Sequence, residues 1–321
     1  MTKVAVIGGG TGLSVLLRGI KNKFDLVSAI VSVADDGGNS GKLREDLGML
    51  PPGDIRSCLV ALADEEVGME DLFNYRFRDG LLKGQNIGNL LLAAFNEMQG
   101  DFEKAISSIG SILNVKGRVI PVTTDDITLC AELTDGNIVV GESHIPRVVM
   151  REKAAIDNIF LQQKGIKTSE TAIKVIDQAD IILLGPGSLY TSILVNFLTD
   201  GLVEALNSSS ACKIYIGNVM TQPGETDGYS LTRHVQELVD IIGFGNIDFV
   251  MANNKVIDSD EIRRYGEENS TQILPDKSDR EYIQSLGATL VENSFIETKQ
   301  GYIRHDAERI GDIINIITME E

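Results

Sequence analysis

The sequence has 321 residues, of which 43% are hydrophobic and 24% charged, an ordinary globular composition with ample material for a large core. Its formal net charge of −18 opposes binding to nucleic acid or to an anionic membrane surface, because both need clustered Lys and Arg. No apolar run approaches the roughly 20 residues that span a bilayer. A phosphorylated ligand must therefore be held by local backbone dipoles and a few cations.

The cysteines and the first residues indicate the compartment. Cys58, Cys130 and Cys212 are far apart and form no C-x-x-C pair, as expected for reduced thiols in a cytosolic protein. Residues 3–7 resemble a strand that leads directly into glycines, and not a signal peptide. We therefore expect a cytoplasmic protein without a membrane span.

Short β-branched runs alternate with amphipathic helical patterns along the chain. A strand at residues 4–7 precedes apolar residues at helical spacing up to Ile20, and a second strand follows at 26–33. This order begins a parallel sheet. Further strands are expected at 118–122, 181–184, 213–216 and 247–251, and helices at 57–63, 191–198, 231–242 and 307–317. The predicted fold class is α/β, with a Rossmann-like, doubly wound, mostly parallel sheet.

Two segments depart from that rhythm. Residues 129–133 and 137–140 flank Thr134-Asp135-Gly136, which predicts a β-hairpin excursion. Residues 254–282 are polar and lack apolar periodicity, which indicates a C-terminal insertion that is a surface excursion or a mobile lid. No linker divides the chain, so we expect one domain over 1–321, with the nucleotide-binding half at about 1–125.

The glycine-rich loop Gly8-Gly9-Gly10-Thr11-Gly12 lies between the first strand and the first helix. Glycines let backbone amides approach a phosphate, and a helix N-terminus favours the negative charge. The alternative is a tight turn without a ligand. A dinucleotide fingerprint would need glycine where Leu13 stands, and the Lys of a Walker loop is missing. The loop predicts phosphate binding and supports NAD only weakly.

Two carboxylates, Asp35 and Asp36, follow the second strand and precede Gly37. Because ligands of doubly wound sheets bind outside the carboxyl ends of the strands, these residues can bind ribose hydroxyls or hold a divalent cation against phosphates. A solvated turn is the alternative. Asp54, at the start of the next helix, is either that helix's cap or a third carboxylate of the site, in which case Arg56 is a phosphate partner.

Other strand ends carry small or amide residues. Gly187 and Ser188 open a second helix after a strand, where a phosphate can bind. Asn218 and Asn253 end later strands and suit a base or sugar, and Asn89 precedes an apolar helix. Each alone is explained by turn chemistry, but their shared position favours one binding rim.

The motifs of several enzyme classes are absent. The sequence has no G-x-S-x-G elbow, no H-E-x-x-H and no His/Cys metal spacing. His234 lies in an amphipathic helix and is expected at the surface or in helix packing. Near the C-terminus, Arg304 can neutralise a phosphate, or the segment around it is simply a helix start capped by Asp306.

Taken together, the loops resemble those of the YvcK-type gluconeogenesis factors of the CofD-like family, which also contains the 2-phospho-lactate transferase of deazaflavin synthesis. The shared segments are Gly-Gly-Gly-Thr-Gly-Leu-Ser, Ala-Asp-Asp-Gly-Gly, Pro-Pro-Gly-Asp-Ile-Arg, Gly-Pro-Gly-Ser-Leu-Tyr-Thr-Ser and Arg-His-Asp-Ala. The resemblance covers essentially the whole chain. Differences occur at Asn39, at Gln85-Asn86 and at Val195, where the family usually has Ser, His-Ser and Pro.

The resemblance implies a regulator that binds a UDP-sugar or related nucleotide and links carbon metabolism to cell-wall synthesis and cell shape. It implies ligand contacts from Thr11 and Arg304, and a metal held by Asp36 and Asp54. Mg²⁺ bound with the nucleotide is the one cofactor considered, and self-association into a homo-oligomer stays open. The alternative is a metal-dependent 2-phospho-lactate transferase that acts on a deazaflavin acceptor. Without an evident catalytic set, we expect a binding protein more than an enzyme.

Overall fold

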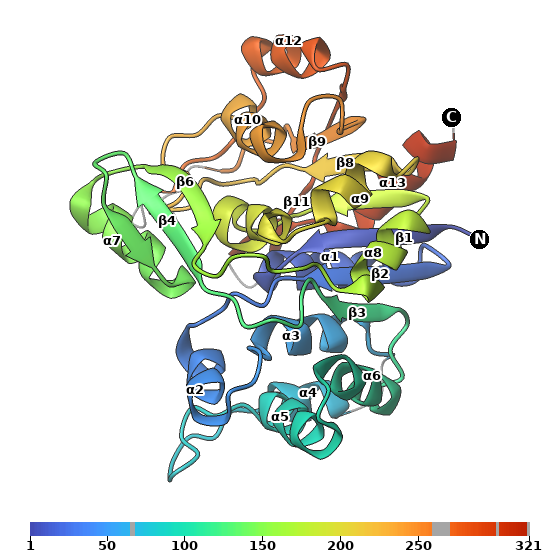
Figure 1. Ribbon diagram of the computed structural model, residues 1–321. Helices are drawn as coiled ribbons and strands as arrows, with labels where there is room; N and C mark the ends of the chain where they lie inside the picture. The colour runs from blue at the N-terminus through green and yellow to red at the C-terminus, as the bar shows by residue number, and fades with distance from the viewer. Residues whose placement is uncertain (65–67, 259–269, 300–301, 320–321) are drawn as a thin grey trace.

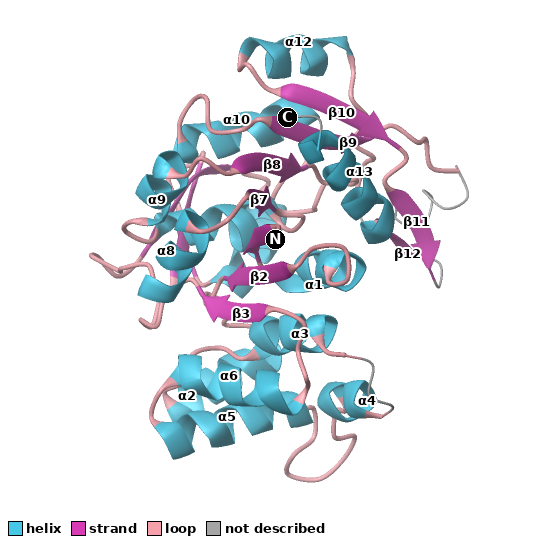
Figure 2. Ribbon diagram, turned by 90° about the vertical axis from the view of Figure 1, so that its right-hand side faces the viewer, coloured by secondary structure: helices cyan, strands magenta, loops and turns pink. Residues whose placement is uncertain are grey.

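The computed structural model describes residues 1–64, 68–258, 270–299 and 302–319. Its centre is a parallel sheet of seven strands within these ranges, in the order β10-β9-β8-β7-β1-β2-β3. Figure 2 shows these strands stacked through the middle of the molecule. The strands are β1 (Lys3–Gly8), β2 (Leu26–Val31), β3 (Arg118–Pro121), β7 (Ile181–Leu184), β8 (Cys212–Ile216), β9 (Phe249–Asn253) and β10 (Thr289–Asn293).

Helices cover both faces of this sheet. In Figure 2, α1 (Gly10–Ile20) and α13 (Ala307–Met319) lie on one face, and α8 (Glu170–Asp177) and α9 (Leu202–Ser208) on the other. Because helices cover both sides of the central strands, these strands are continuously apolar: all four residues of β7 are buried. The remaining helices near the top are α10 (Leu231–Ile242) and α12 (Lys277–Ser285).

A block of helices lies beyond the β3 edge of the sheet, at the bottom of Figure 1. It consists of α2 (Gly38–Leu47), α3 (Gly53–Leu62), α4 (Met69–Asn74), α5 (Ile87–Gln99) and α6 (Phe102–Ile112). Helix α3 also packs against α1, so this block borders the start of the first helix.

Two smaller β elements complete the fold. The predicted hairpin is confirmed: β4 (Leu129–Leu133) pairs antiparallel with β5 (Ile138–Val140). The sequence did not indicate that β6 (Ile156–Leu161) pairs with the other side of β4, or that α7 (Ile145–Glu152) follows a short 3-10 turn (Glu142–His144). A second hairpin, β11 (Ile296–Lys299) with β12 (Tyr302–His305), leads into α13.

The chain winds outward from β1 in both directions, to β2 and β3 on one side and to β7, β8, β9 and β10 on the other. The doubly wound, Rossmann-like expectation is therefore confirmed. In such sheets ligands bind where the strand order reverses, outside the carboxyl ends of the two central strands. Here those strands are β1 and β7, which lead into the two glycine loops, at Gly9 and at Gly185.

Some sequence expectations need correction. The helix expected at 191–198 is a π-helical turn (Leu189–Ile193) followed by a 3-10 helix (Leu194–Leu198). There Asn196, which is fully buried, donates its side-chain amide to the carbonyl of Ser192 at 2.7 Å.

The polar segment 254–282 was expected to be a surface excursion or a lid. Its residues 259–269 lie outside the described residues, and its end forms the start of α12, which Asp276 caps. None of the described helices combines the length and the apolar character needed to cross a bilayer.

Candidate functional site

The two glycine loops pack directly against each other at the switch point. A Cβ at Gly12 would lie 2.9 Å from the carbonyl oxygen of Pro186, and one at Gly187 would lie 3.3 Å from that of Gly9. Gly10 has φ of +67°, a backbone conformation that favours glycine. Part of the glycine requirement therefore comes from loop-to-loop packing, and not only from access for a phosphate.

Asp54 faces this loop from the next helical segment. Its Oδ2 accepts a hydrogen bond from the backbone N–H of Gly10 at 2.6 Å. Helix α3 has no side-chain cap, so Asp54 does not cap it. Of the two interpretations of Asp54, the structure therefore favours the one in which its carboxylate faces the glycine loop. Burial raises the pKa of Asp54 to about 6, with a further increase from the charge of Asp35 and an opposing effect of the Gly10 bond.

The two carboxylates after β2 point to different partners. Asp36 accepts the backbone N–H of Ser143 at 2.8 Å, which fixes it to the turn before α7. Asp35 accepts the N–H of Gly37 at 2.9 Å. Its other oxygen lies near Gly53, where an added Cβ would be 3.3 Å away. Asp35 is thus the neighbour that acts on Asp54, while Asp36 holds the α7 excursion against the end of β2.

Two further acids, which the sequence analysis missed, belong to the same region. Burial raises the pKa of Glu142 well above its ordinary value, and the charges of Asp35, Asp54, Glu225 and Asp36 raise it further. Burial also raises the pKa of Glu225 to about 7. Glu225 Oε1 accepts bonds at 3.0 and 2.9 Å, while its buried Oε2 has no partner. Glu142 follows the end of β5 by two residues and Glu225 lies in the loop after β8, and neither belongs to a glycine loop, so no local motif marked them as site residues.

The described residues contain no preformed site for the predicted metal. No group of three or more His, Cys, Asp or Glu side chains within the described ranges is arranged to hold a metal. One oxygen each of Asp35, Asp36 and Asp54 is taken by a backbone amide.

The remaining predicted rim residues have varied surroundings. Ser188 lies half-buried before the π-helical turn, and its carbonyl accepts the N–H groups of residues 192 and 193. Asn218 is half-buried after β8. Asn253 is buried, and its side-chain oxygen accepts from Phe295 and Lys255 at 3.2 and 3.3 Å, so it mainly organises the loops after β9 and β10.

Asn89 is buried in the first turn of α5. Its Nδ2 donates to Asn39 Oδ1 at 2.9 Å, and its own Oδ1 has no partner. Asn86 caps α5 by accepting the Asn89 N–H at 3.0 Å. The departures from the family pattern, at Asn39, Gln85 and Asn86, are therefore neighbours that connect α2 to α5.

Thr11 and Arg304 line the same cavity, which has a volume of about 750 Å³. Thr11 lies in the first turn of α1 and Arg304 lies on β12, paired with Glu297 of β11. The cavity runs along α1 between these strands and the helices α3 and α4; its other lining residues include Ser14, Arg18, Ser57, Glu70, Asn74, Asp306 and Glu308. An ion pair of 2.6 Å between Arg18 and Glu70 crosses it.

Arg56 lies behind one wall of this cavity. Its guanidinium donates to the side-chain oxygens of Asn74 and Ser57, both at 3.0 Å. Burial lowers the pKa of Arg56, as does the nearby Arg76, while Asp54 raises it. Arg56 therefore connects the buried acids with the cavity wall.

The histidines have structural surroundings. His234 is fully buried in α10 and bonds the Ser230 carbonyl at 2.8 Å, as the helix-packing expectation requires. His305 Nε2 lies 3.1 Å from the carbonyl oxygen of Gly217 and connects β12 to the loop after β8. Asp306 caps α13 through the N–H of Arg309 at 3.0 Å.

Comparison with known proteins identifies the family. The model of the family described as 2-phospho-L-lactate transferase CofD matches residues 4–296, and the chain belongs to this family. A relative from Thermoanaerobacterium thermosulfurigenes is 48% identical over 312 residues, covering 97% of this chain and 95% of the relative. The gluconeogenesis factor of Bacillus subtilis is 44% identical over 313 residues, covering 97% and 96%.

The fold has a close counterpart among solved structures. The crystal structure of a UPF0052 family member from Bacillus halodurans is similar with a TM-score of 0.93 and 42% identity, covering 98% of this chain and 99% of that chain. The chain is therefore similar to gluconeogenesis factors over nearly its whole length.

Proposed function

We propose that this protein binds a nucleotide sugar of the UDP-N-acetylglucosamine type and acts as a cytoplasmic regulator that links carbon supply to cell-wall growth and cell shape. The observation that carries the proposal is that Thr11 and Arg304, 293 positions apart, line one cavity at the start of α1. The similarity to gluconeogenesis factors supports the regulatory role.

The cavity offers suitable chemistry for both halves of such a ligand. The N-terminal turn of α1 favours negative charge, and the Arg304 guanidinium and Thr11 hydroxyl are donors to phosphate oxygens. Because Asp54 already accepts the Gly10 amide, the phosphates are expected to use the amides of Thr11 and Gly12. Acidic side chains in the lining, Glu297 and Glu308, can accept hydrogen bonds from sugar hydroxyls.

Isothermal titration calorimetry with UDP-N-acetylglucosamine tests the proposal. We expect micromolar binding, on the order of −8 kcal/mol, and a rise in the thermal midpoint. UMP and free N-acetylglucosamine are the matched controls and should each bind more weakly. Absence of both heat and thermal shift with every UDP-sugar tried would contradict it.

A divalent cation bound with the nucleotide is part of the proposal. The aspartates supply hard oxygen ligands of the type that Mg²⁺ prefers. Burial is the main cause of the raised pKa values of Asp54 and Glu142, and neighbouring acids raise both further, which is the part that a cation would relieve. In this proposal Asp36 and Asp54 would hold the Mg²⁺, which would bring a diphosphate to an acidic region.

The family name favours a second function, a phospho-lactyl transferase. The matching family model is described as a 2-phospho-L-lactate transferase, and the metal-compatible aspartates suit that chemistry. Product formation from a guanylyl phospholactate donor and a deazaflavin acceptor would establish it. We expect no product, because the relatives from Thermoanaerobacterium thermosulfurigenes and Bacillus subtilis, which match nearly the whole chain, bear the name gluconeogenesis factor and not transferase.

A further inference from the structure

The side-chain amide of Asn74, the last residue of α4, lies in the wall of the cavity that Thr11 and Arg304 line. Its Oδ1 accepts a hydrogen bond from Arg56 Nη1 at 3.0 Å. A guanidinium has donors and no acceptor, so the oxygen of the amide faces Arg56. No acceptor among the described residues takes the Nδ2 group, whose N–H groups therefore remain for a ligand in the cavity.

Arg56 is itself held in place, which fixes the orientation of the Asn74 amide. Its Nη2 donates to Ser57 Oγ at 3.0 Å. A Cβ at Gly88 would lie 2.8 Å from Arg56 Cδ, so the stem of the side chain packs closely against the first turn of α5. Turning the Asn74 amide over would place its N–H groups against those of the guanidinium, where neither finds an acceptor. Asn74 therefore offers the cavity a donor and not an acceptor.

The two walls of the cavity suit different parts of a nucleotide sugar. Glu297 on β11 and Glu308 in α13 line it on one side of α1, and Asn74 on α4 lines it on the other (Figure 2). A nucleotide sugar carries its diphosphate between the sugar and the nucleoside. With the phosphates at the start of α1, the carboxylates can accept hydrogen bonds from the sugar hydroxyls. The base is then left to the wall of Asn74.

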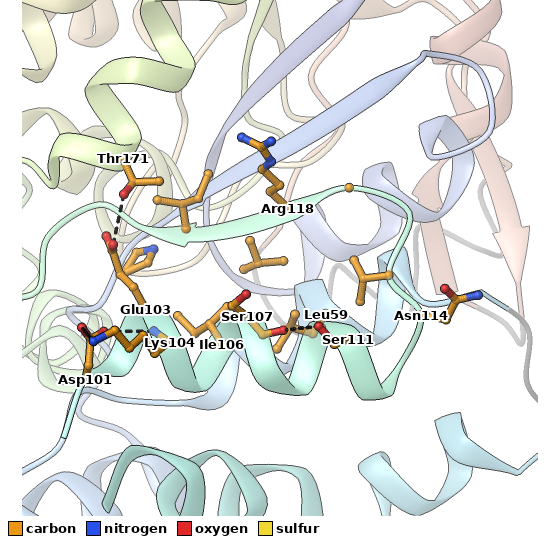
Figure 3. A pocket seen from close by; sticks show the side chains of 16 residues that line it. Leu59, Asp101, Glu103, Lys104, Ile106, Ser107, Ser111, Asn114, Arg118 and Thr171 are labelled. Carbon is orange, nitrogen blue, oxygen red and sulfur yellow. Dashed lines mark hydrogen bonds and ion pairs between the residues drawn. The ribbon is translucent and has the colours of Figure 1, made fainter. Parts of the chain in front are cut away.

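Another hollow, a groove of about 540 Å³ between α6 and β3, lies apart from the glycine loops (Figure 3). Its two acids are already engaged: Asp101 pairs with Lys104 at 3.5 Å, and Glu103 accepts from Thr171 at 3.0 Å, both drawn as dashed lines in Figure 3. None of its lining residues belongs to the loops that open α1 and the π-helical turn. We therefore expect the phosphates in the cavity of Thr11, and the base beside it.

We propose that the Arg56–Asn74 pair selects a nucleotide sugar with uracil over one with cytosine; this inference rests on the nucleotide-sugar binding proposed above. The two bases differ at C4, where uracil has a carbonyl and cytosine an amino group. Asn74 Nδ2 donates to the uracil carbonyl. The cytosine amino group is itself a donor, so both groups would give up water without gaining a bond. Asn74 is thus a specificity-determining residue, and Arg56 is the positioning residue that orients its amide.

Isothermal titration calorimetry of the full chain with UDP-glucose and CDP-glucose tests the selection, because the two ligands share the sugar, the ribose and the diphosphate. We expect UDP-glucose to bind at least about tenfold more tightly. Asn74→Asp replaces the donor by an acceptor, so the ratio of the two dissociation constants should shift at least about tenfold towards CDP-glucose. Asn158→Asp, at an exposed position on β6, is the matched control and should keep the parent ratio.

The positioning role of Arg56 is tested in the same way. Arg56→Met removes the donors that orient the amide and should reduce the preference for UDP-glucose to about threefold or less. Arg56→Lys restores a donor and should recover the preference. Asn74 is exposed, so the thermal midpoint of Asn74→Asp should hardly change. Ser107→Trp fills the α6–β3 groove from an exposed position on α6 and should leave both affinities unchanged.

The outcomes separate this inference from the function on which it rests. Failure of both nucleotide sugars to bind would contradict the proposed function and this inference with it. Equal binding of both by the parent, or the parent ratio in Asn74→Asp, would overturn the selection and leave nucleotide-sugar binding intact. An unchanged ratio in Arg56→Met would remove the positioning role of Arg56. A loss of affinity in Ser107→Trp would place the ligand in the groove and overturn the inference.

Discussion

The backbone N–H of Gly10 donates to Asp54 Oδ2 at 2.6 Å, so an internal carboxylate occupies the first amide of the phosphate-type loop. Asp54 comes from the start of α3, 44 positions later in the chain. This bond holds the glycine loop against the start of α3. If the proposed ligand binds, we expect its phosphate to lie towards Thr11 and the cavity that Arg304 lines.

Asp54→Asn should make stability less dependent on pH. The pKa of Asp54 is raised to about 6 in the folded protein, so the folded protein binds this proton more tightly than the unfolded chain does. The neutral carboxyl therefore adds to the free energy of unfolding at low pH, and this contribution is lost as pH rises from about 4 to 6. Urea unfolding should show the variant gaining up to about 3 kcal/mol on the parent above pH 6. A difference that does not change between pH 4 and 7 would contradict this; exposed Asp157→Asn is the control.

Thr11→Ala and Arg304→Ala should each raise the dissociation constant of the nucleotide sugar at least roughly tenfold, because each removes a hydrogen bond to a phosphate. Both side chains are exposed, so the unfolding midpoint of the free protein should hardly change. Calorimetry and thermal unfolding measure the two quantities. Arg151→Ala, on the exposed face of α7, should affect neither. If Arg304→Ala lowers the midpoint and keeps the affinity, the residue has a structural role.

Glu70→Gln should increase the affinity for the nucleotide sugar. The 2.6 Å ion pair holds Arg18 to Glu70 across the cavity, and the neutral amide would release Arg18 to a diphosphate. The gain should be modest, about three- to tenfold, because the pair is half-exposed. Arg18→Ala should weaken binding by a similar factor. Equal affinities for the parent and both variants would place the phosphates away from α1.

The cation is tested by titrating the nucleotide sugar in Mg²⁺ and in EDTA. We expect the affinity for the nucleotide sugar to depend strongly on Mg²⁺, and this dependence to be lost in Asp36→Asn and in Asp54→Asn. Asp35→Asn is the comparison that shows which of the two carboxylates after β2 is required. Equal affinity in EDTA would discard the cation and leave these aspartates as partners of sugar hydroxyls or backbone amides.

Gly12→Ala should destabilise the protein by about 1–3 kcal/mol, because its Cβ would lie 2.9 Å from the Pro186 carbonyl oxygen. Gly110→Ala is the control within a helix: its Cβ would meet Leu59 at an ordinary 3.6 Å, so it should stabilise by about 0.5–1 kcal/mol. Chemical denaturation gives both values. A neutral Gly12→Ala would show that the two glycine loops can separate.

The sequence by itself determined the parallel sheet and the position of the glycine loop. Buried strands such as Ile181–Leu184 are short apolar runs, and the first helix presents Leu13, Leu16, Leu17 and Ile20 on one face, so local periodicity suffices for both. The first hairpin was equally predictable, because Thr134-Asp135-Gly136 is a turn between two β-type runs. Strand β10 was not, since Thr289–Asn293 is only half-buried and lacks the apolar run.

Only the tertiary structure decided which side chains meet. Asp54 could cap its own helix or face the site, and the packing of α3 against α1 made it a partner of Gly10. Glu142 interacts with Asp35, Asp54 and Glu225 only because the turn before α7 and the loop after β8 are brought together by the fold. Such contacts join residues with no periodic or local relation in the sequence, and their pKa shifts depend on burial, which the chain acquires when its layers close.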